Sequence, residues 1–166
     1  MSIYSIYFSP TQGTKKITNM LAQEIGAYQE IDLCEYTDQI PERIFSENDI
    51  CLIGVPSYGG RVPRTAAERI NGFKGNGASA ILVVSYGNRD YDDTLIELYD
   101  VVTSQGFACI GGVAAIAEHS IMHQFASGRP DTDDMHQLKR FAKEIKEKID
   151  ASILTEVQVK GNRPYK

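Results

Sequence analysis

The sequence predicts an α/β domain in which a parallel sheet of five strands carries helices on both faces. Short apolar stretches alternate along the chain with longer segments that have helical spacing. Loops rich in glycine and hydroxyl side chains follow the apolar stretches. In a parallel sheet such loops meet beyond the carboxyl ends of the strands, at the edge where ligands bind.

Apolar composition locates the five expected strands. They cover residues 3–8, 30–34, 49–55, 78–84 and 107–117. The third and fourth are almost entirely apolar, as strands covered on both faces are. Two consecutive glycines, Gly111 and Gly112, interrupt the last strand and indicate a bulge or a bend.

Helical spacing and turn residues locate four helices between and after these strands. The first covers about residues 13–27, and the second ends near Phe73, where turn residues 74–77 follow. The third contains the apolar positions between Leu95 and Val102. The last begins at acidic residues 131–134, just after a proline, as helix starts commonly do.

Length and charge limit the class of protein. A chain of 166 residues forms one domain that buries a core without disulfides or metals. We expect this domain to cover residues 1–156 and residues 157–166 to form a C-terminal tail. The formal net charge of −5 argues against a nucleic-acid partner, because such proteins carry a basic face.

Cysteine usage and hydropathy bear on the compartment. Cys34, Cys51 and Cys109 are dispersed and form no CxxC pair, so we expect neither an iron–sulfur nor a zinc site. Unpaired cysteines are typical of a reducing compartment, and the N-terminus has no signal-peptide pattern. No stretch approaches the ~20 apolar residues of a membrane span. The sequence therefore predicts a cytoplasmic protein without a membrane partner.

The first loop, residues 9–15, has the composition of a phosphate site. It joins the first strand to the first helix, and the first amides of a helix have no partner inside it. Ser9, Thr11 and Thr14 add hydroxyl donors, while Gly13 allows close backbone approach. The alternative is a helix start capped by Thr11 or Thr14 without a ligand.

Three further loops, at residues 56–63, 85–91 and 118–120, follow strands and converge with the first. Tyr58 and either Tyr86 or Tyr91 are suited to stacking on a flat ring. Asn88 both donates and accepts hydrogen bonds, which suits the polar edge of such a ring. The alternative for each tyrosine is that it caps the core with its hydroxyl in water.

Four sequence blocks carry a resemblance to a known family: YFSPTQGTKK (7–16), GVPSYGGRVP (54–63), SYGNRDYDDTLIEL (85–98) and AEHS (117–120). The chain resembles flavodoxin-type, FMN-binding proteins, and more narrowly the flavodoxin half of the bacterial flavodoxin–ferredoxin fusion family. The resemblance implies a three-layer sandwich with strand order 2-1-3-4-5 and FMN as the cofactor.

The resemblance also implies a set of site residues. The phosphate would lie at Ser9, Thr11, Gly13 and Thr14, and the ring between the loops at 56–61 and 85–91. The full set is Ser9, Thr11, Gln12, Gly13, Thr14, Pro56, Ser57, Tyr58, Gly59, Gly60, Arg61, Ser85, Tyr86, Gly87, Asn88, Tyr91 and His119. For His119 the alternative is a cap on backbone groups. A carbonyl of the Gly59-Gly60 peptide, turned toward the flavin, is the candidate for tuning its redox properties.

Two features depart from the family pattern. Its phosphate loop usually reads SPTGTT, whereas Gln12-Gly13 stand here where Gly-Thr is expected. Fusion proteins continue into a ferredoxin unit, and the tail at 157–166 resembles the linker into that unit. We therefore expect a ferredoxin or ferredoxin-like domain as partner, either a separate protein or one lost by truncation.

Basic residues in and beside the ligand loops allow two interpretations. Lys15, Arg61, Arg64 and Arg89 either dock an acidic partner or substrate, or pair with nearby acids such as Glu68, Asp90 and Asp92. The first functional hypothesis is an electron-transfer flavoprotein that works with a ferredoxin. The alternatives are an FMN-dependent NAD(P)H oxidoreductase acting on a quinone, flavin or metal ion, and a non-redox interaction module.

Overall fold

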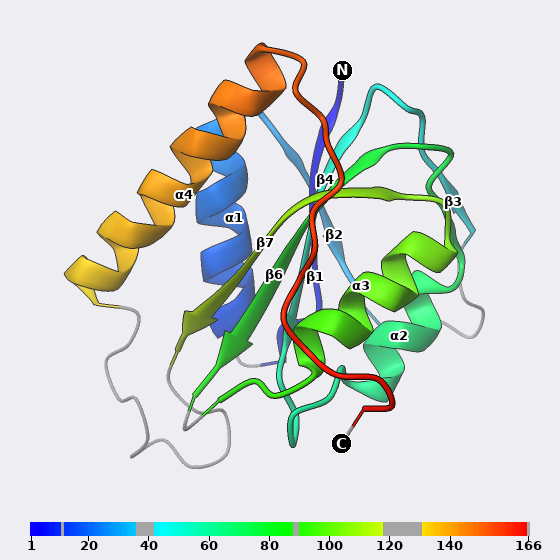
Figure 1. Ribbon diagram of the computed structural model, residues 1–166, viewed down its shortest axis with the longest axis vertical. Coiled ribbons are helices and arrows are strands. Elements are labelled where there is room, and N and C mark those ends of the chain that lie inside the picture. The colour runs from blue at the N-terminus through cyan, green and yellow to red at the C-terminus, as the bar shows by residue number, and fades with distance from the viewer. Residues whose placement is uncertain (11, 36–41, 88–89, 118–130, 166) are drawn as a thin grey trace.

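Parallel pairing of five strands builds the centre of the molecule (Figure 1). The computed structural model describes residues 1–10, 12–35, 42–87, 90–117 and 131–165. The strands are β1 (Ile3–Tyr7), β2 (Gln29–Asp32), β4 (Ile50–Pro56), β6 (Ser79–Tyr86) and β7 (Ala108–Ile116). Their order in the sheet is β2-β1-β4-β6-β7, and every neighbouring pair is parallel. Numbered among themselves the five strands have the order 2-1-3-4-5, so this prediction is confirmed.

Helices lie on both faces of the sheet and complete the three layers. In Figure 1, α1 (Gly13–Ile25) and α4 (Thr132–Asp150) lie on one side, and α2 (Arg64–Ile70) and α3 (Thr94–Ser104) lie on the other. The last helix begins with a capping box, in which Asp131 and Asp134 each accept a hydrogen bond from the other's backbone amide, at 3.0 and 2.9 Å. Its predicted start at the acidic cluster is therefore confirmed.

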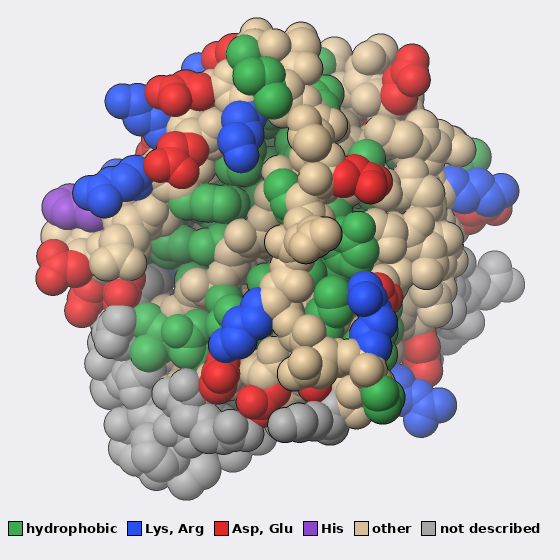
Figure 2. Space-filling view, viewed as in Figure 1, with side chains coloured by type: hydrophobic (Ala, Val, Ile, Leu, Met, Phe, Trp, Pro, Cys, Tyr) green, Lys and Arg blue, Asp and Glu red, His purple; other side chains and the backbone are tan. Residues whose placement is uncertain are grey.

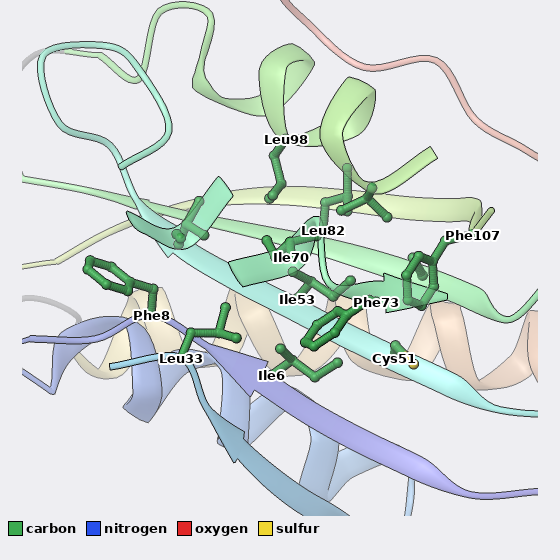
Figure 3. Packing of buried hydrophobic residues seen from close by; sticks show 14 of the residues in the cluster. Ile6, Phe8, Leu33, Cys51, Ile53, Ile70, Phe73, Leu82, Leu98 and Phe107 are labelled. Carbon is green, nitrogen blue, oxygen red and sulfur yellow. The ribbon is translucent and has the colours of Figure 1, made fainter. Parts of the chain in front are cut away.

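The sheet separates two apolar cores, and this explains the continuous apolar strands. Along β4, Leu52 packs in the core beneath α1 and α4, whereas Ile53 packs in the opposite core beneath α2 and α3. Successive side chains of a strand point to opposite faces, so both sets must be apolar. Figure 3 shows the second core, where Ile6, Ile53, Leu82 and residues of the two helices converge.

The second helix is shorter than predicted, and a small second sheet replaces its expected end. Helix α2 ends at Ile70, and the strand β5 (Phe73–Lys74) then pairs in parallel with β3 (Arg43–Ile44). The buried ring of Phe73 packs edge-on against Phe45 at 5.5 Å between centroids. Residues 73–74 thus pack against an aromatic ring that is distant in the sequence, and the local spacing of apolar residues does not reveal this contact.

The predicted irregularity in the last strand is a bulge. Ala80 pairs with Cys109, but the next residue, Ile81, pairs with Gly111, so Ile110 is the extra residue. A Cβ atom on Gly111 would lie 2.7 Å from the Cδ1 atom of Ile145 on α4. Glycine at this position therefore allows α4 to pack closely against the sheet.

The chain after α4 crosses the open edge of the sheet and returns along α3 (Figure 1). The Val157 amide donates to the carbonyl of Cys109 on β7 at 3.0 Å. Further along, the Asn162 amide donates to a carboxylate oxygen of Asp93 at 2.8 Å. Among the residues described here, no helix has the length and apolar character needed to span a membrane.

Candidate functional site

The first loop ends in a helix start whose N-cap residue carries no hydroxyl. Gln12 is the N-cap of α1, has a left-handed φ of 74°, and makes no side-chain capping bond within the described part of the chain. The alternative in which Thr14 caps the helix is therefore wrong. Ser9 accepts the Lys15 amide through its Oγ atom at 2.9 Å. The amides of Gly13 and Thr14 belong to the first turn, and within the described part of the chain no acceptor is recorded for them, which makes them candidates to bind a ligand.

Ser85 connects the first loop to the loops on the other side of the site. Its hydroxyl lies 2.7 Å from the Thr14 hydroxyl, and both side chains are buried. Its carbonyl accepts the amide of Ser57 at 2.8 Å. Thr14 thus directs its hydroxyl into the protein toward β6, and the group it leaves for an anion is its amide.

The Gly59-Gly60 pair forms a two-residue hairpin turn. Tyr58 and Arg61 exchange backbone hydrogen bonds of 2.9 and 3.1 Å, and the two glycines have φ values of 59° and 79°. Positive φ at both central residues is the geometry of a type I′ turn. The tip of this turn projects from the carboxyl end of β4, where the ring was expected.

The turn packs against the third loop. A Cβ atom on Gly60 would lie 2.6 Å from a carboxylate oxygen of Asp92, so the backbone of the turn lies close to the Asp92 side chain. The Ser57 hydroxyl lies 2.7 Å from that of Thr94, the first residue of α3. The loops at 56–61 and 90–94 are therefore held together at their bases.

The three tyrosines differ in their exposure. Tyr86 and Tyr91 form a ring pair with centroids 5.4 Å apart and an interplanar angle of 53°. Tyr91 also packs against the core beneath α3, as the core-capping alternative expects. Tyr58 is 40% exposed. Tyr58 is therefore the most exposed of the three tyrosines and the best placed to meet a ligand from solvent.

Three of the four basic residues of this region are described, and they lie in ion pairs or against aromatic rings. Arg61 makes a two-pronged contact with Glu97, with bonds of 2.7 and 3.0 Å, and these hydrogen bonds raise the pKa of Arg61. Arg64 pairs with Glu68 at 3.0 Å on the surface, as the ion-pair interpretation predicted. Lys15 lies over the ring of Tyr7, 5.6 Å from its centroid. Arg89 lies outside the described residues.

The remaining expected site residues divide into two groups. Pro56 ends β4 and pairs in register with Ser85, and Gly87 directly follows β6, so these residues lie at the same sheet edge. Thr11, Asn88 and His119 lie outside the described residues.

The first turn of α3 also lies at this edge, and the sequence prediction missed it. Glu97 accepts both the Arg61 side chain and the Val62 amide, the latter at 2.9 Å, and so fixes the base of the glycine turn. Asp93, the N-cap of α3, is only 2% exposed and accepts the Asn162 amide. The segment Asp90–Thr94 resembles a helix start, which was the only local signal for these roles.

These groups fit a ligand that has an anion at one end and a flat ring at the other. The first-turn amides of Gly13 and Thr14 suit a phosphate, because the helix dipole adds partial positive charge there. An exposed tyrosine beside a tight glycine turn suits an aromatic ring. Ser85 bonds to both halves, which places them next to each other at one edge of the sheet.

Comparison with known proteins identifies the fold. No family model matches the chain, and no curated protein matches it. Among solved structures it is similar to the rubredoxin oxygen:oxidoreductase of Desulfovibrio gigas, with 16% identity and a TM-score of 0.63. That match covers 92% of this chain but 37% of the other, so the chain spans little more than a third of that protein.

Two further likenesses extend over nearly the whole of both chains. An NADH:FMN oxidoreductase (EMOB) in apo form has 13% identity, a TM-score of 0.64 and 88% coverage of each chain. The flavodoxin of Fusobacterium nucleatum, bound to flavin mononucleotide, has 14% identity and a TM-score of 0.56, covering 89% of this chain and 98% of its own. At such low sequence identities, the similarity supports a shared fold and nothing more. The protein has the flavodoxin-like α/β fold.

Proposed function

We propose that this protein binds FMN at the carboxyl edge of its sheet and serves as an electron-transfer flavoprotein. One observation carries the proposal: Ser85 bonds through its hydroxyl to Thr14 and through its carbonyl to Ser57. A helix start suited to phosphate and a glycine turn suited to a ring are thereby joined at one edge. This arrangement matches the two ends of FMN better than it matches either a simple anion or a simple aromatic compound.

The phosphate would lie at the start of α1. The amides of Gly13 and Thr14 donate to it, and the dipole of a 13-residue helix adds favourable charge. Ser9 orders the loop by accepting the Lys15 amide. The departure at Gln12-Gly13 is consistent with this role, because left-handed Gln12 turns the chain into the helix.

The ring would lie beside the Gly59-Gly60 turn. Tyr58 offers a face for stacking, and the backbone groups at the tip of the turn are positioned to meet the edge of the ring. When FMN is bound, it supplies the electron transfer, while the protein supplies binding, orientation and electrostatics. The contact of Gly60 with Asp92 fixes the turn against the third loop, which limits its movement when the ligand changes charge.

For the partner, we propose a ferredoxin-type iron–sulfur protein and a cytoplasmic location. The family resemblance of the ligand loops supports this pairing, and the unpaired cysteines support the location, since Cys34, Cys51 and Cys109 are all free thiols. A second candidate is an FMN-dependent NAD(P)H oxidoreductase. The structural similarity to an NADH:FMN oxidoreductase, over 88% of both chains, supports this second candidate.

Binding of FMN and riboflavin to matched variants of Gly13 tests the proposal. Gly13→Asp introduces a carboxylate at the expected phosphate position, whereas Gly13→Asn is its neutral isostere. Among the described residues, the nearest neighbour of a Cβ atom there would be the Cβ atom of Ala117 at 3.7 Å, so a side chain can be placed without a clash. An aspartate in the first turn also favours the helix, so folding should be preserved.

We expect the unmodified protein to bind FMN more tightly than riboflavin in equilibrium dialysis. Charge repulsion should raise the Kd of Gly13→Asp for FMN by about tenfold or more relative to Gly13→Asn, while the riboflavin values of the two variants stay equal. Equal binding of FMN and riboflavin by the unmodified protein would contradict the phosphate assignment. Absence of binding to either would refute the proposed function.

A further inference from the structure

Residues 157–165, which we name the strap, lie against the edge of the sheet and against α3. The Val157 amide bonds to the carbonyl of Cys109. Val159 packs over Gly112, because a Cβ atom added to Gly112 would lie 3.3 Å from the Cγ1 atom of Val159. Val157 and Val159 pack against the same core as the strands beneath them. The space-filling view shows hydrophobic side chains flanking this path, with basic and acidic side chains side by side along its lower part (Figure 2).

The middle of the strap holds the third ligand loop. The Lys160 ammonium lies 3.5 Å from a carboxylate oxygen of Asp90 and 4.8 Å from the centre of the Tyr91 ring. Tyr91 is the ring partner of Tyr86. A single lysine side chain therefore contacts two residues of the loop expected beside the flavin.

The next residues bind the start of α3. The Asn162 amide donates to Asp93, the buried N-cap of the helix. At Gly161 the backbone has a φ of 147°, and a Cβ atom would lie 2.1 Å from the Cγ2 atom of Ile96. Only a glycine allows the strap to lie this close to the helix.

The end of the strap binds α3 through Arg163 and reaches the glycine turn through the contact of Tyr165 with Arg61. Arg163 donates two hydrogen bonds of 2.9 and 2.6 Å to Asp100, and they lower the pKa of that carboxyl. Tyr165 donates to the same carboxylate. Its ring lies under the Arg61 guanidinium, 4.9 Å from centroid to Cζ. Arg61 follows the Gly59-Gly60 turn directly, so the strap contacts both loops of the expected ring site.

We propose that the strap is a positioning element of the flavin ring site, so that strap docking and ring binding stabilise each other. The inference rests on the proposed function. Lys160 fixes Tyr91 on one side and Tyr165 fixes Arg61 on the other, while none of the strap contacts described above involves the phosphate loop. Coupling between two equilibria is reciprocal. Detaching the strap must therefore weaken ring binding, and binding the ring must protect the strap.

The variants Arg163→Ala and Lys160→Ala test the coupling from the strap. Both residues are surface-exposed, so we expect both variants to fold. Lys74→Ala is the matched control, because Lys74 forms a comparable 2.7 Å pair with Glu42 on the small second sheet. We expect Arg163→Ala to raise the Kd for FMN and for riboflavin by the same factor, about threefold to tenfold, with Lys160→Ala acting in the same direction and Lys74→Ala leaving both values unchanged.

Equal weakening of both ligands distinguishes the strap from the phosphate loop, whose Gly13→Asp variant should affect FMN alone. Hydrogen exchange of the unmodified protein tests the reciprocal effect: amides of residues 157–165 should exchange more slowly with riboflavin bound. If FMN binds but both strap variants keep the unmodified Kd values and strap exchange does not change, the coupling is refuted while the proposed function stands. If the unmodified protein binds no flavin, both proposals fail.

Discussion

Gly60 has two separate reasons to be glycine, and both bear on the expected ring site. Its φ of 79° lies in the left-handed region, and a Cβ atom would meet the carboxylate of Asp92. Gly59 shares the positive φ, but a Cβ atom there would meet nothing within 4 Å among the residues described. The two neighbouring glycines therefore differ in what substitution would cost.

We expect Gly60→Val to lower the free energy of unfolding by about 1–3 kcal/mol and to weaken FMN binding, because a β-branched residue is strained at positive φ and displaces Asp92. Gly59→Asn is the control, since Asn-Gly is a preferred type I′ pair. Urea denaturation and FMN titration of both variants provide the measurement. Equal stability of the two variants would contradict the assigned turn.

Residue identities in the turn and the first loop could be predicted from the sequence, but their partners could not. The glycine pair and the hydroxyls of residues 9–14 lie in short local patterns. The bond from Thr14 to Ser85 joins residues 71 positions apart, and that from Arg61 to Glu97 joins residues 36 apart. Such contacts depend on the assembled sheet, so the hydroxyl of Thr14 turned inward although composition suggested a ligand role.

At the scale of elements, long periodic segments were predictable and short ones were not. The first turn of α4 contains its own capping box, so sequence alone locates its start. Strands β3 and β5 have two residues each, too few for any pattern, and they form where Phe45 and Phe73 pack. The strap lies between these two cases. The sequence shows which of its residues are apolar or polar, but its path over α3 depends on tertiary contacts.

Docking of the strap should raise the pKa of its Tyr165 side chain. Burial, followed by the hydrogen bond to Asp100, raises the pKa of Tyr165 to about 12. Because the folded-state pKa lies above the ordinary value of about 10, the contribution of the neutral phenol to docking is complete below that pH. The contribution is then lost as the pH rises through the folded-state value.

Ultraviolet titration of tyrosinate measures this effect. The difference between the unmodified protein and Tyr165→Phe isolates one of the nine tyrosines. We expect this difference curve to have its midpoint near pH 12, as the raised pKa requires. A midpoint at the value of free tyrosine, about 10, would show that the strap is undocked in solution.

At the scale of the molecule, topology brings the functional segments together. Parallel strands in the order β2-β1-β4-β6-β7 place the loops after β1, β4 and β6 at one edge, between helices of opposite faces. The sequence predicted this convergence because loop composition changes after each apolar strand. The proposed function therefore depends on one physical claim: a helix start and two ring-side loops form a single FMN site.

Chemical-shift mapping of backbone amides during FMN titration tests that claim most directly. We expect one saturable event to shift the amide signals of Gly13 and Thr14 together with those of Gly59, Gly60 and Gly87. The strap amides should shift in the same event if the coupling holds. Shifts confined to the small sheet at residues 43–44 and 73–74, or separate saturation of the first loop and the glycine turn, would contradict a single site.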